Sequence, residues 1–441
     1  MLQIIAIIFY GNWFRHVQPN DPRAASFTGG IIQNIYPLFQ DVHVMIFIGF
    51  GLLLTSFHRF RLSQVINLFW IAALTLQYYF LFFTLWQGSI YSNFPDRINI
   101  NSILLTRAEF AAGAMMIACS AVLGKANQLQ FLIIAMVGVG SYTLNEAIII
   151  GKLEVYDIGG SMIIHTFGGC YGLVIALFYR YKENWGNKNL FETHDNLSAA
   201  TIGTLFLWVF WPSFNSALAT STASQNIAVV NTYFALIGSC LTAYLTSFMR
   251  GSRRFKITSA LNPSLSGAII IAASADILYD GWVAYVIGGL VGIISVLLWD
   301  HMATLFTYYE YSNMGCIVNL HIVPGILGGL ISGIVRAVYI NNRGGYQVAA
   351  TAISIALGSL FGLLVGVLTM NLHEERPTND YQNDRTAVAV EDTIEGDLVA
   401  YAAPIATVVA NQYQITYKDD HGNNLMTVPA NEPLPMAVDN I

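Results

Sequence analysis

Twelve long apolar stretches divide the first 372 residues of this 441-residue chain, and they constrain its fold more than any other feature. Most of them approach the ~20 residues that a helix needs to cross ~30 Å of hydrocarbon. In lipid, every backbone N–H and C=O must be satisfied within the protein, so only helices and closed barrels can span the bilayer. The stretches are Leu2–Phe14, Val42–Phe57, Val65–Trp86, Ile103–Leu123, Leu129–Ile150, Ser161–Tyr179, Ala199–Leu218, Ile227–Phe248, Ile257–Ala275, Trp282–Trp299, Cys316–Val335 and Val348–Leu372. The sequence therefore predicts an all-α, polytopic membrane bundle of about twelve transmembrane helices.

The composition agrees with a membrane protein rather than a soluble one. Hydrophobic residues make up 55% of the chain and charged residues only 10%, whereas a soluble globular domain carries about 25% charged residues. The 37 glycines suit helices that approach one another closely in lipid. The four cysteines all fall in apolar stretches, so we expect free thiols and no disulfide framework.

Charge divides the chain into two parts. The segment after Leu372 carries twelve acidic and three basic residues, a balance of −9, whereas the part before it carries fourteen acidic and seventeen basic residues, a balance of +3. We expect residues 1–372 to form the transmembrane domain and residues 373–441 to form an acidic, mostly disordered tail. Short β-prone runs such as Tyr413–Tyr417 interrupt this tail.

The distribution of Lys and Arg predicts the orientation in the membrane. Loops after even-numbered stretches hold ten of these residues, and loops after odd-numbered stretches hold six. Because cytoplasmic loops carry the excess of Lys and Arg, both termini are expected in the cytoplasm, in a multi-pass protein of the plasma membrane. The basic run Met249–Lys256 is interpreted as a topology anchor on anionic lipid rather than as a nucleic-acid site.

Two histidines lie inside apolar stretches and share the downstream pattern H-x-x-x-G-x-x-G. The two copies comprise His165, Gly169 and Gly172, and His321, Gly325 and Gly328. An ionisable side chain at membrane depth is costly, rarely faces lipid and marks a functional site. Neutral imidazole can donate from one nitrogen and accept at the other, so two rings in line could pass a small polar molecule along. For either histidine alone, a plain helix–helix hydrogen bond would be the better interpretation; the shared spacing favours function.

The positions of the two histidines indicate an internal repeat. His165 lies in the sixth stretch and His321 in the eleventh, five stretches apart. If the first stretch is an addition, stretches two to six and seven to eleven form two halves, and an odd number of spans inverts the second half relative to the first. We therefore expect a five-plus-five inverted repeat with one additional N-terminal helix, and both histidines near the bilayer midplane.

Two carboxylates at membrane depth are further candidates. Asp157 lies eight residues before His165, where it could accept hydrogen bonds from the N–H groups at a helix start. A simple helix cap is the plainer interpretation, and the two roles are compatible. Glu146 could lead cations to a pore entrance.

The chain carries no convincing enzyme motif. It lacks G-x-x-x-x-G-K-[ST], H-E-x-x-H and C-x-x-C. We predict no catalytic residue, no metal site and no cofactor.

Longer segments around these residues carry a family likeness. They are Tyr36–Met45, Ala121–Lys125, Gly159–Gly168, Gly203–Ser216, and Asn319–His321 with Pro324–Gly329. Through these segments, residues 2–372 resemble the Rh glycoprotein branch of the ammonium transporter superfamily.

The resemblance implies roles for particular residues. His165 and His321 match the paired pore histidines of that family, and Phe110 and Phe214 match two stacked phenylalanines that close the outer pore mouth. Asp157 matches a carboxylate below the vestibule. The resemblance also implies a homotrimer in the lipid bilayer with one pore per subunit, which moves ammonia, with carbon dioxide as a second candidate.

The chain departs from the family pattern at several positions. The family has Gly after the second pore histidine, whereas this chain has Ile322, which we expect to narrow the pore. Glu109 precedes the first gate phenylalanine, and Arg107 lies two residues earlier, where a less basic entrance is expected. These differences bear on conductance and selectivity rather than on the fold.

The expected function is a membrane channel for ammonia. Ammonium would be recruited at an outer vestibule, with Glu146 and Glu109 as candidate residues, and would lose its proton before an apolar lumen, because desolvating a cation costs far more than passing a neutral molecule. Two alternatives stay open: a non-conducting Rh-type membrane scaffold, and a proton-coupled ammonium transporter that uses the same histidine and aspartate residues.

Overall fold

The structure is a computed structural model, which describes eleven segments of the chain. These are residues 2–16, 35–54, 61–92, 98–123, 125–179, 194–251, 257–308, 316–340, 343–372, 414–418 and 424–429. They fall into two units, Met1–Ala387 and Val388–Ile441.

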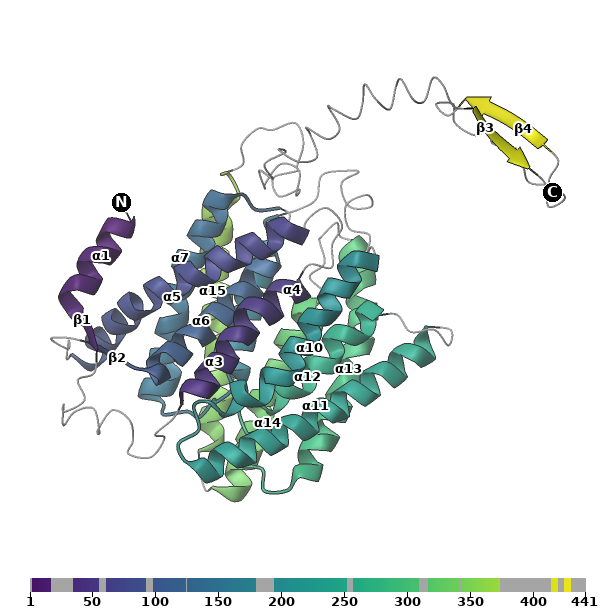
Figure 1. Ribbon diagram of the computed structural model, residues 1–441. Helices are drawn as coiled ribbons and strands as arrows, with labels where there is room; N and C mark the ends of the chain where they lie inside the picture. Colours follow the sequence, from purple (N-terminus) through teal and green to yellow (C-terminus); the bar gives the residue numbers. More distant parts are fainter. Residues whose placement is uncertain are drawn as a thin grey trace. The chain divides into compact units, whose positions relative to one another are not determined.

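The first unit is a helix bundle (Figure 1). Its first part comprises α1 (Leu2–Trp13), α3 (Tyr36–Val44), η1 (Met45–Phe50), α4 (Gly51–Leu53), α5 (Arg61–Tyr91), α6 (Ser102–Ser120), α7 (Gln128–Glu146), η2 (Ala147–Lys152), η3 (Ser161–Thr166) and α8 (Phe167–Ala176). Its second part comprises α10 (His194–Ser216), α11 (Thr222–Arg250), α12 (Ile257–Ile271), α13 (Gly281–Tyr308), η4 (Ile317–Ile322), α14 (Val323–Tyr339) and α15 (Gly344–Thr369). The η segments are π-helical turns that continue into neighbouring α-helices.

Each of the twelve predicted apolar stretches corresponds to one helix or one continuous helical run. Among the described residues, nine helices are long and apolar enough to cross a membrane. Three shorter apolar helices accompany them: Leu2–Asn12, Ser161–Ala176 and Ala260–Ile271. The all-α, multi-pass membrane architecture is therefore confirmed, whereas a count of twelve spans stays a prediction.

The additional N-terminal helix packs against α5. In Figure 1, α1 lies at the edge of the bundle. The Tyr78 hydroxyl donates to the Leu2 carbonyl at 2.8 Å, and the Gln77 amide donates to the Gln3 side-chain oxygen at 2.8 Å. The helix is thus attached to α5, outside the two five-helix halves.

Both histidine helices begin with a π-helical turn in which histidine is the fifth residue. The turns are Ser161–Thr166, which precedes α8, and Ile317–Ile322, which precedes α14. π-Helical turns are rare and occur frequently at functional sites. Hydropathy did not predict them, because a π turn adds one residue per turn without changing how apolar the segment is.

The first glycine of each pattern allows the two histidine helices to cross closely. A Cβ on Gly169 would lie 2.5 Å from Ile322 Cγ1, and a Cβ on Gly325 would lie 2.7 Å from Thr166 Oγ1 and 3.0 Å from its backbone nitrogen. Ile322 and Thr166 each follow their histidine directly. Each helix therefore presents the residue after its histidine to the glycine of the other helix, which is the reciprocity expected of an inverted repeat.

The second glycine of each pattern packs against an equivalent helix of its own half. A Cβ on Gly172 would lie 2.6 Å from Ala118 Cα in α6, and one on Gly328 would lie 2.7 Å from the Ile270 carbonyl oxygen in α12. When the halves are counted from α3 and from α10, α6 and α12 are the third helix of each. Small residues at such crossings let helix backbones approach in a membrane.

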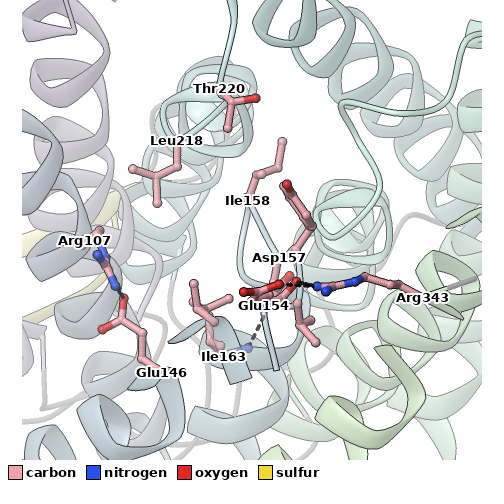
Figure 2. A pocket seen from close by; sticks show the side chains of 12 residues that line it. Arg107, Glu146, Glu154, Asp157, Ile158, Ile163, Leu218, Thr220 and Arg343 are labelled. Atoms are coloured by element: carbon pink, nitrogen blue, oxygen red, sulfur yellow. Dashed lines mark hydrogen bonds and ion pairs between the residues drawn. The ribbon is translucent and has the colours of Figure 1, made fainter. Parts of the chain in front are cut away.

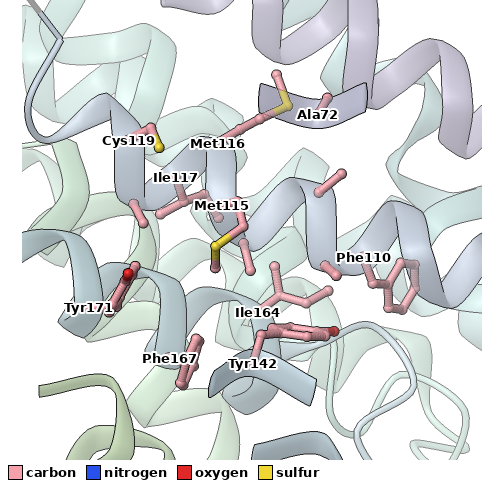
Figure 3. Packing of buried hydrophobic residues seen from close by; sticks show 14 of the residues in the cluster. Ala72, Phe110, Met115, Met116, Ile117, Cys119, Tyr142, Ile164, Phe167 and Tyr171 are labelled. Carbon is pink, nitrogen blue, oxygen red and sulfur yellow. The ribbon is translucent and has the colours of Figure 1, made fainter. Parts of the chain in front are cut away.

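A closely packed hydrophobic core lies on one side of the first histidine helix (Figure 3). Met115 from α6, Tyr142 from α7, Ile164 from η3, and Phe167 and Tyr171 from α8 are all buried in one hydrophobic cluster. The Tyr171 hydroxyl donates to a carbonyl of α7 at 2.8 Å, which satisfies its polar end. This packing holds the histidine helix on one side.

Four short strands accompany the helices in the part of the chain that the structure describes. In the first unit, β1 (Phe14–His16) pairs in parallel with β2 (Ile98–Ile100). In the second unit, β3 (Gln414–Lys418) pairs antiparallel with β4 (Asn424–Pro429). The β-prone run predicted at Tyr413–Tyr417 overlaps β3. The disorder predicted for the rest of residues 373–441 falls outside the described residues, and the domain boundary at residue 372 stays a prediction.

Candidate functional site

The two histidines of the repeat meet in the interior of the bundle. His165 is 1% exposed and His321 is 5% exposed. Their Nδ1 atoms lie 3.0 Å apart, within hydrogen-bond distance. The rings are nearly parallel, with an interplanar angle of 8° and centroids 5.2 Å apart. The repeat therefore predicted correctly that the two side chains lie together.

The Nδ1–Nδ1 contact determines how protons are arranged when both rings are neutral. One ring must carry its proton on Nδ1 and donate it, while the other accepts with its Nδ1 lone pair. The donating ring then has a free acceptor at Nε2, and the accepting ring has a donor there. The pair as a whole thus offers one donor and one acceptor without any net charge.

Aromatic rings extend from His165 toward one side of the bundle. Trp211 lies 5.9 Å from His165 between ring centroids, and Phe214 meets Trp211 edge-on at 6.3 Å. Phe214 stacks on Phe110 at 4.3 Å with an interplanar angle of 25°. The two phenylalanines that the resemblance singled out are thus in direct contact, and each is 1% exposed.

Phe50 lies on the other side of the histidine pair. Its ring stacks on His321 with centroids 6.3 Å apart and an interplanar angle of 24°. Together with the pair and the rings on the His165 side, it completes a continuous aromatic line through the bundle. We call this set the aromatic line: Phe110, Phe214, Trp211, His165, His321 and Phe50.

Two polar nitrogens in the aromatic line are buried without a hydrogen-bond partner among the described residues. They are Nε2 of His165 and Nε1 of Trp211. Buried polar groups are normally hydrogen-bonded, so each unsatisfied group calls for an explanation. A small polar molecule in the line would satisfy both.

Asp157 caps the first histidine helix, as predicted. Its Oδ2 accepts from the backbone N–H of Met162 at 2.8 Å and of Ile163 at 2.9 Å. Its Oδ1 is buried and has no hydrogen-bond partner among the described residues. Gly160, with φ of +78°, makes the turn between the carboxylate and the helix. The carboxylate thus fixes the start of the turn that carries His165.

Ile322 lies next to the histidine pair and against the first histidine helix. It is 8% exposed, and its Cγ1 occupies the space that a side chain at position 169 would need. The side chain therefore contributes to the helix crossing at Gly169. Narrowing of a pore by Ile322 stays a prediction.

Glu146 has its oxygen atoms already engaged by protein groups. Arg107 contacts Oε1 through Nε at 2.9 Å and Nη2 at 2.8 Å, and the Tyr79 hydroxyl donates to Oε2 at 2.9 Å. The guanidinium also lies over the Phe83 ring, 4.7 Å from its centroid. The sequence singled out both charged residues, but not that they pair.

Glu109 points toward α3. Its Oε1 pairs with Nδ1 of His43, whose side chain is 47% exposed, while the Glu109 side chain is 2% exposed. Oε2 of Glu109 is buried and has no hydrogen-bond partner among the described residues. Glu109 is therefore directed toward α3 next to Phe110, and it contacts His43, a histidine that the sequence did not single out.

A cavity of about 410 Å³ lies beside the start of the first histidine helix (Figure 2). Its lining residues are Arg107, Glu146, Ile150, Glu154, Val155, Tyr156, Asp157, Ile158, Ile163, Leu218, Thr220 and Arg343. Figure 2 shows the Arg107–Glu146 pair on one wall and Asp157 with the Glu154–Arg343 pair on another. We call this cavity the outer pocket. All its charged residues lie near those ends of the apolar stretches that the Lys and Arg distribution predicts to face the outside. Glu109 is not among the residues that line it.

The outer pocket lies close to the phenylalanine pair along the chain. Arg107 comes one helical turn before Phe110 in α6, and Leu218 follows Phe214 by four residues, just beyond the end of α10. Residues one turn apart share a helix face. The pocket therefore adjoins the Phe110 end of the aromatic line.

Sequence reasoning missed three participants: Trp211, Phe50 and the partner of Glu146. Trp211 stands three residues before Phe214, a helical spacing that could have indicated a shared face. Phe50 carries no signal of its own in a segment rich in Phe and Ile. The Arg107–Glu146 pair joins residues 39 apart in the chain, which local patterns do not predict.

Comparisons with known proteins match most of the chain. The sequence model of the Ammonium Transporter Family matches residues 26–375. The ammonium transporter Rh type C of Oncorhynchus mykiss is 34% identical over 402 residues, which cover 82% of this chain and 81% of the relative. The ammonium transporter Rh type B of Mus musculus is 34% identical over 343 residues, which cover 75% of this chain and 74% of the relative.

Solved structures share the fold. The chain resembles Nitrosomonas europaea Rh50 with a TM-score of 0.72 at 24% identity, covering 89% of this chain and 100% of that one. It also resembles Saccharomyces cerevisiae Mep2 with a TM-score of 0.63 at 20% identity, covering 78% of this chain and 85% of that one. At these identities the likeness concerns the fold alone.

Proposed function

Because this chain belongs to the ammonium transporter family and to its Rh branch, we propose that it is a membrane channel that conducts ammonia. Ammonium arrives at the outer pocket and loses its proton there, and neutral ammonia passes along the aromatic line. The protein acts as a passive conduit and not as an enzyme.

The histidine pair is the observation that carries this proposal. Ammonia can both donate and accept hydrogen bonds, and the neutral pair offers one donor and one acceptor at its Nε2 atoms. Ammonium can only donate, and in the dry interior it would lose its hydration without gaining a counter-charge from neutral imidazoles. The unpartnered Nε2 of His165 is a ready partner for the neutral molecule. The line therefore favours ammonia over ammonium.

The phenylalanine pair supports a barrier between pocket and line. Phe110 and Phe214 stack at 4.3 Å and are almost fully buried, so their rings must separate for a molecule to pass between them. We assign them to an outer gate. Asp157 holds the first histidine helix in register with this gate, and its unpartnered Oδ1 adds negative potential to the outer pocket.

The remaining assignments follow from the same proposal. Glu146 belongs to the vestibule. Glu109 acts on the gate indirectly, because it directly precedes Phe110 in α6 and contacts His43. Ile322 narrows the line beside His321. The functional unit is a homotrimer in the plasma membrane with one pore per subunit and both termini in the cytoplasm, residues 1–372 forming the channel and residues 373–441 a cytoplasmic tail. Carbon dioxide is a second small neutral molecule that such a line suits.

Proton-coupled ammonium transport is the second candidate, and one contact favours it. The Nδ1–Nδ1 hydrogen bond at 3.0 Å is a route by which a proton could pass between the rings. In that case ammonia and a proton would cross the same site separately, and net charge would move. A non-conducting scaffold is the third candidate; the retained histidine pair counts against it.

Flux in reconstituted liposomes tests the proposal. We expect His165→Ala and His321→Ala each to lower the ammonia flux by about tenfold, equivalent to ~1.4 kcal/mol of barrier. His301→Ala, at an exposed histidine in α13, is the matched control and should leave the flux unchanged. If folded wild-type protein gives no flux above that of protein-free liposomes, the scaffold is the better account.

A further inference from the structure

The Arg107 guanidinium forms an ion pair with the Glu146 carboxylate of the vestibule. A positive charge of the protein itself therefore already neutralises this carboxylate. Two of its nitrogens lie within 2.9 Å of Glu146 Oε1, and Tyr79 engages Oε2, so both carboxylate oxygens are used. The Phe83 ring beneath the guanidinium adds a cation–π contact. Three independent contacts therefore hold this pair in one geometry.

The arginine is the more accessible member of the pair. The Arg107 side chain is 24% exposed and the Glu146 side chain is 3% exposed. Both residues line the outer pocket, so a cation there meets a carboxylate that already has its counter-charge. A buried carboxylate attracts a cation only through negative charge that no neighbouring group balances. Here the Arg107 guanidinium balances the Glu146 charge at hydrogen-bond distance.

The other charges of the outer pocket do not replace Glu146. Glu154 and Arg343 form a second pair, but their side chains are 67% and 51% exposed, so water and salt screen them. Asp157 is buried on another wall, where its Oδ2 caps the first histidine helix and its unpartnered Oδ1 adds negative potential. The compensation of Glu146 by Arg107 is therefore the main electrostatic contact on the wall next to Phe110.

We propose that Arg107 is a specificity-determining residue that acts as a tethered cation, competing with ammonium for Glu146 and so reducing recruitment of cations to the outer pocket. The inference rests on the proposed function, because it concerns how ammonium reaches the gate. Arg107 lies one turn before Phe110 on α6, at the point where a molecule leaves the pocket for the aromatic line. The arginine raises the ammonium concentration needed for half-maximal flux and favours entry of the neutral molecule.

The test compares charge-matched substitutions in liposomes, with ammonium chloride as the probe. Arg107→Gln removes the charge and retains a hydrogen-bond donor for Glu146. We expect the half-saturating ammonium concentration to fall by about tenfold at low ionic strength, since an unscreened charge in a cleft raises the local cation concentration by that order. At high salt the difference should shrink. Arg107→Lys keeps the charge and should stay close to wild type.

Two further variants determine whether the effect acts through Glu146. Glu146→Gln leaves the guanidinium without its counter-charge, so the half-saturating concentration should rise. The double variant Arg107→Gln with Glu146→Gln removes both charges and should return toward wild type. Arg250→Gln is the matched control: it breaks an exposed ion pair with Asp300, away from the outer pocket, and should change nothing.

The outcomes separate this inference from the proposed function. Wild-type liposomes without flux would overturn the proposed function and the inference together. Wild-type flux with the same half-saturating concentration in Arg107→Gln would overturn the inference alone. A double variant that keeps the full shift would also overturn it, because the effect would not depend on Glu146. If Arg107→Gln does not fold, Glu146→Gln decides: a half-saturating concentration that does not rise contradicts the tethered-cation role.

Discussion

The two histidine helices share the way they cross and differ in the residue that follows histidine. Each has a π-helical turn with histidine as the fifth residue, and each histidine is followed by a residue that packs on a glycine of the other helix. That residue is Thr166 in one helix and Ile322 in the other. The Asp157 side chain caps the start of the first helix, while the residues that precede Cys316 lie outside the described part of the chain.

This comparison separates the features that hold the His165–His321 pair together from the features that change its surroundings. The shared features bring the two rings into hydrogen-bond contact. The residue after histidine acts beside one ring only. Substitutions at the shared glycines should therefore weaken the packing of the two helices, whereas substitutions at the residue that differs should alter the flux with a smaller loss of stability.

The largest effect is expected at the glycine with backbone neighbours. Gly325→Ala places a methyl group 2.6 Å from the Ser161 carbonyl oxygen and 3.0 Å from the Thr166 nitrogen, atoms that cannot move without shifting η3. Overpacking of this kind typically costs about 1–3 kcal/mol. We expect the variant to lower the thermal unfolding midpoint in detergent most strongly and to lose its flux.

Gly169→Ala is the matched comparison, because it meets a side chain instead. Its methyl group would lie 2.5 Å from Ile322 Cγ1, so Gly169→Ala should cost less stability when Ile322 is already alanine than when it is isoleucine. Equal losses in the two glycine variants, or the same cost of Gly169→Ala in both backgrounds, would contradict the reciprocal packing.

The next effect concerns the Asp157 cap of the first histidine helix. Asp157→Ala removes the acceptor for two backbone N–H groups, and losing an N-cap costs about 0.5–2 kcal/mol. Asp157→Asn retains an accepting oxygen and should lose less. We expect the flux to fall in the order wild type, Asn, Ala, in parallel with thermal stability. An unchanged flux in Asp157→Ala would mean that the cap does not position His165.

The sequence predicted the helices well because hydropathy is a local property. All twelve apolar stretches correspond to helical runs, and the repeated histidine–glycine spacing predicted the contact between His165 and His321. The phenylalanine contact came only from the family resemblance. The π-helical turns and the Arg107–Glu146 pair were not predicted, because a helical register and a contact between distant segments depend on packing across the bundle.

A smaller effect should follow from making the residues after the histidines alike. Ile322→Thr copies the first helix: it keeps a branched side chain against Gly169, puts a hydroxyl in place of the Cγ1 methylene and removes the Cδ1 methyl group. If that methyl group narrows the line, the flux should rise modestly without a large change in thermal stability. A flux equal to that of wild type would assign Ile322 to packing on Gly169 alone.

The smallest effect concerns the far end of the first histidine helix. There the Lys125 ammonium donates to the Tyr179 carbonyl, whereas α14 carries Arg336 in its own last turn. Burial lowers the pKa of Lys125 from 10.5 to about 7. Between these values the unfolded chain binds more protons than the folded one, so stability rises as pH increases from about 7 toward 10.5. Below this window both states are protonated, and the cost of burying the charge is fully present.

Removal of the buried amine should flatten this pH dependence. Lys125→Met should show a smaller rise in thermal midpoint than wild type across the same pH window, while Lys152→Met, at an exposed lysine, should follow wild type. An identical slope in Lys125→Met and wild type would refute the assignment.

Simultaneous recording of internal pH and membrane current in wild-type liposomes tests the central claim most directly. If neutral ammonia passes the His165–His321 pair, adding ammonium outside should make the interior alkaline, because entering ammonia takes up protons, and no matching inward current should flow. A steady inward current that scales with ammonium and disappears in both His165→Ala and His321→Ala would contradict the account.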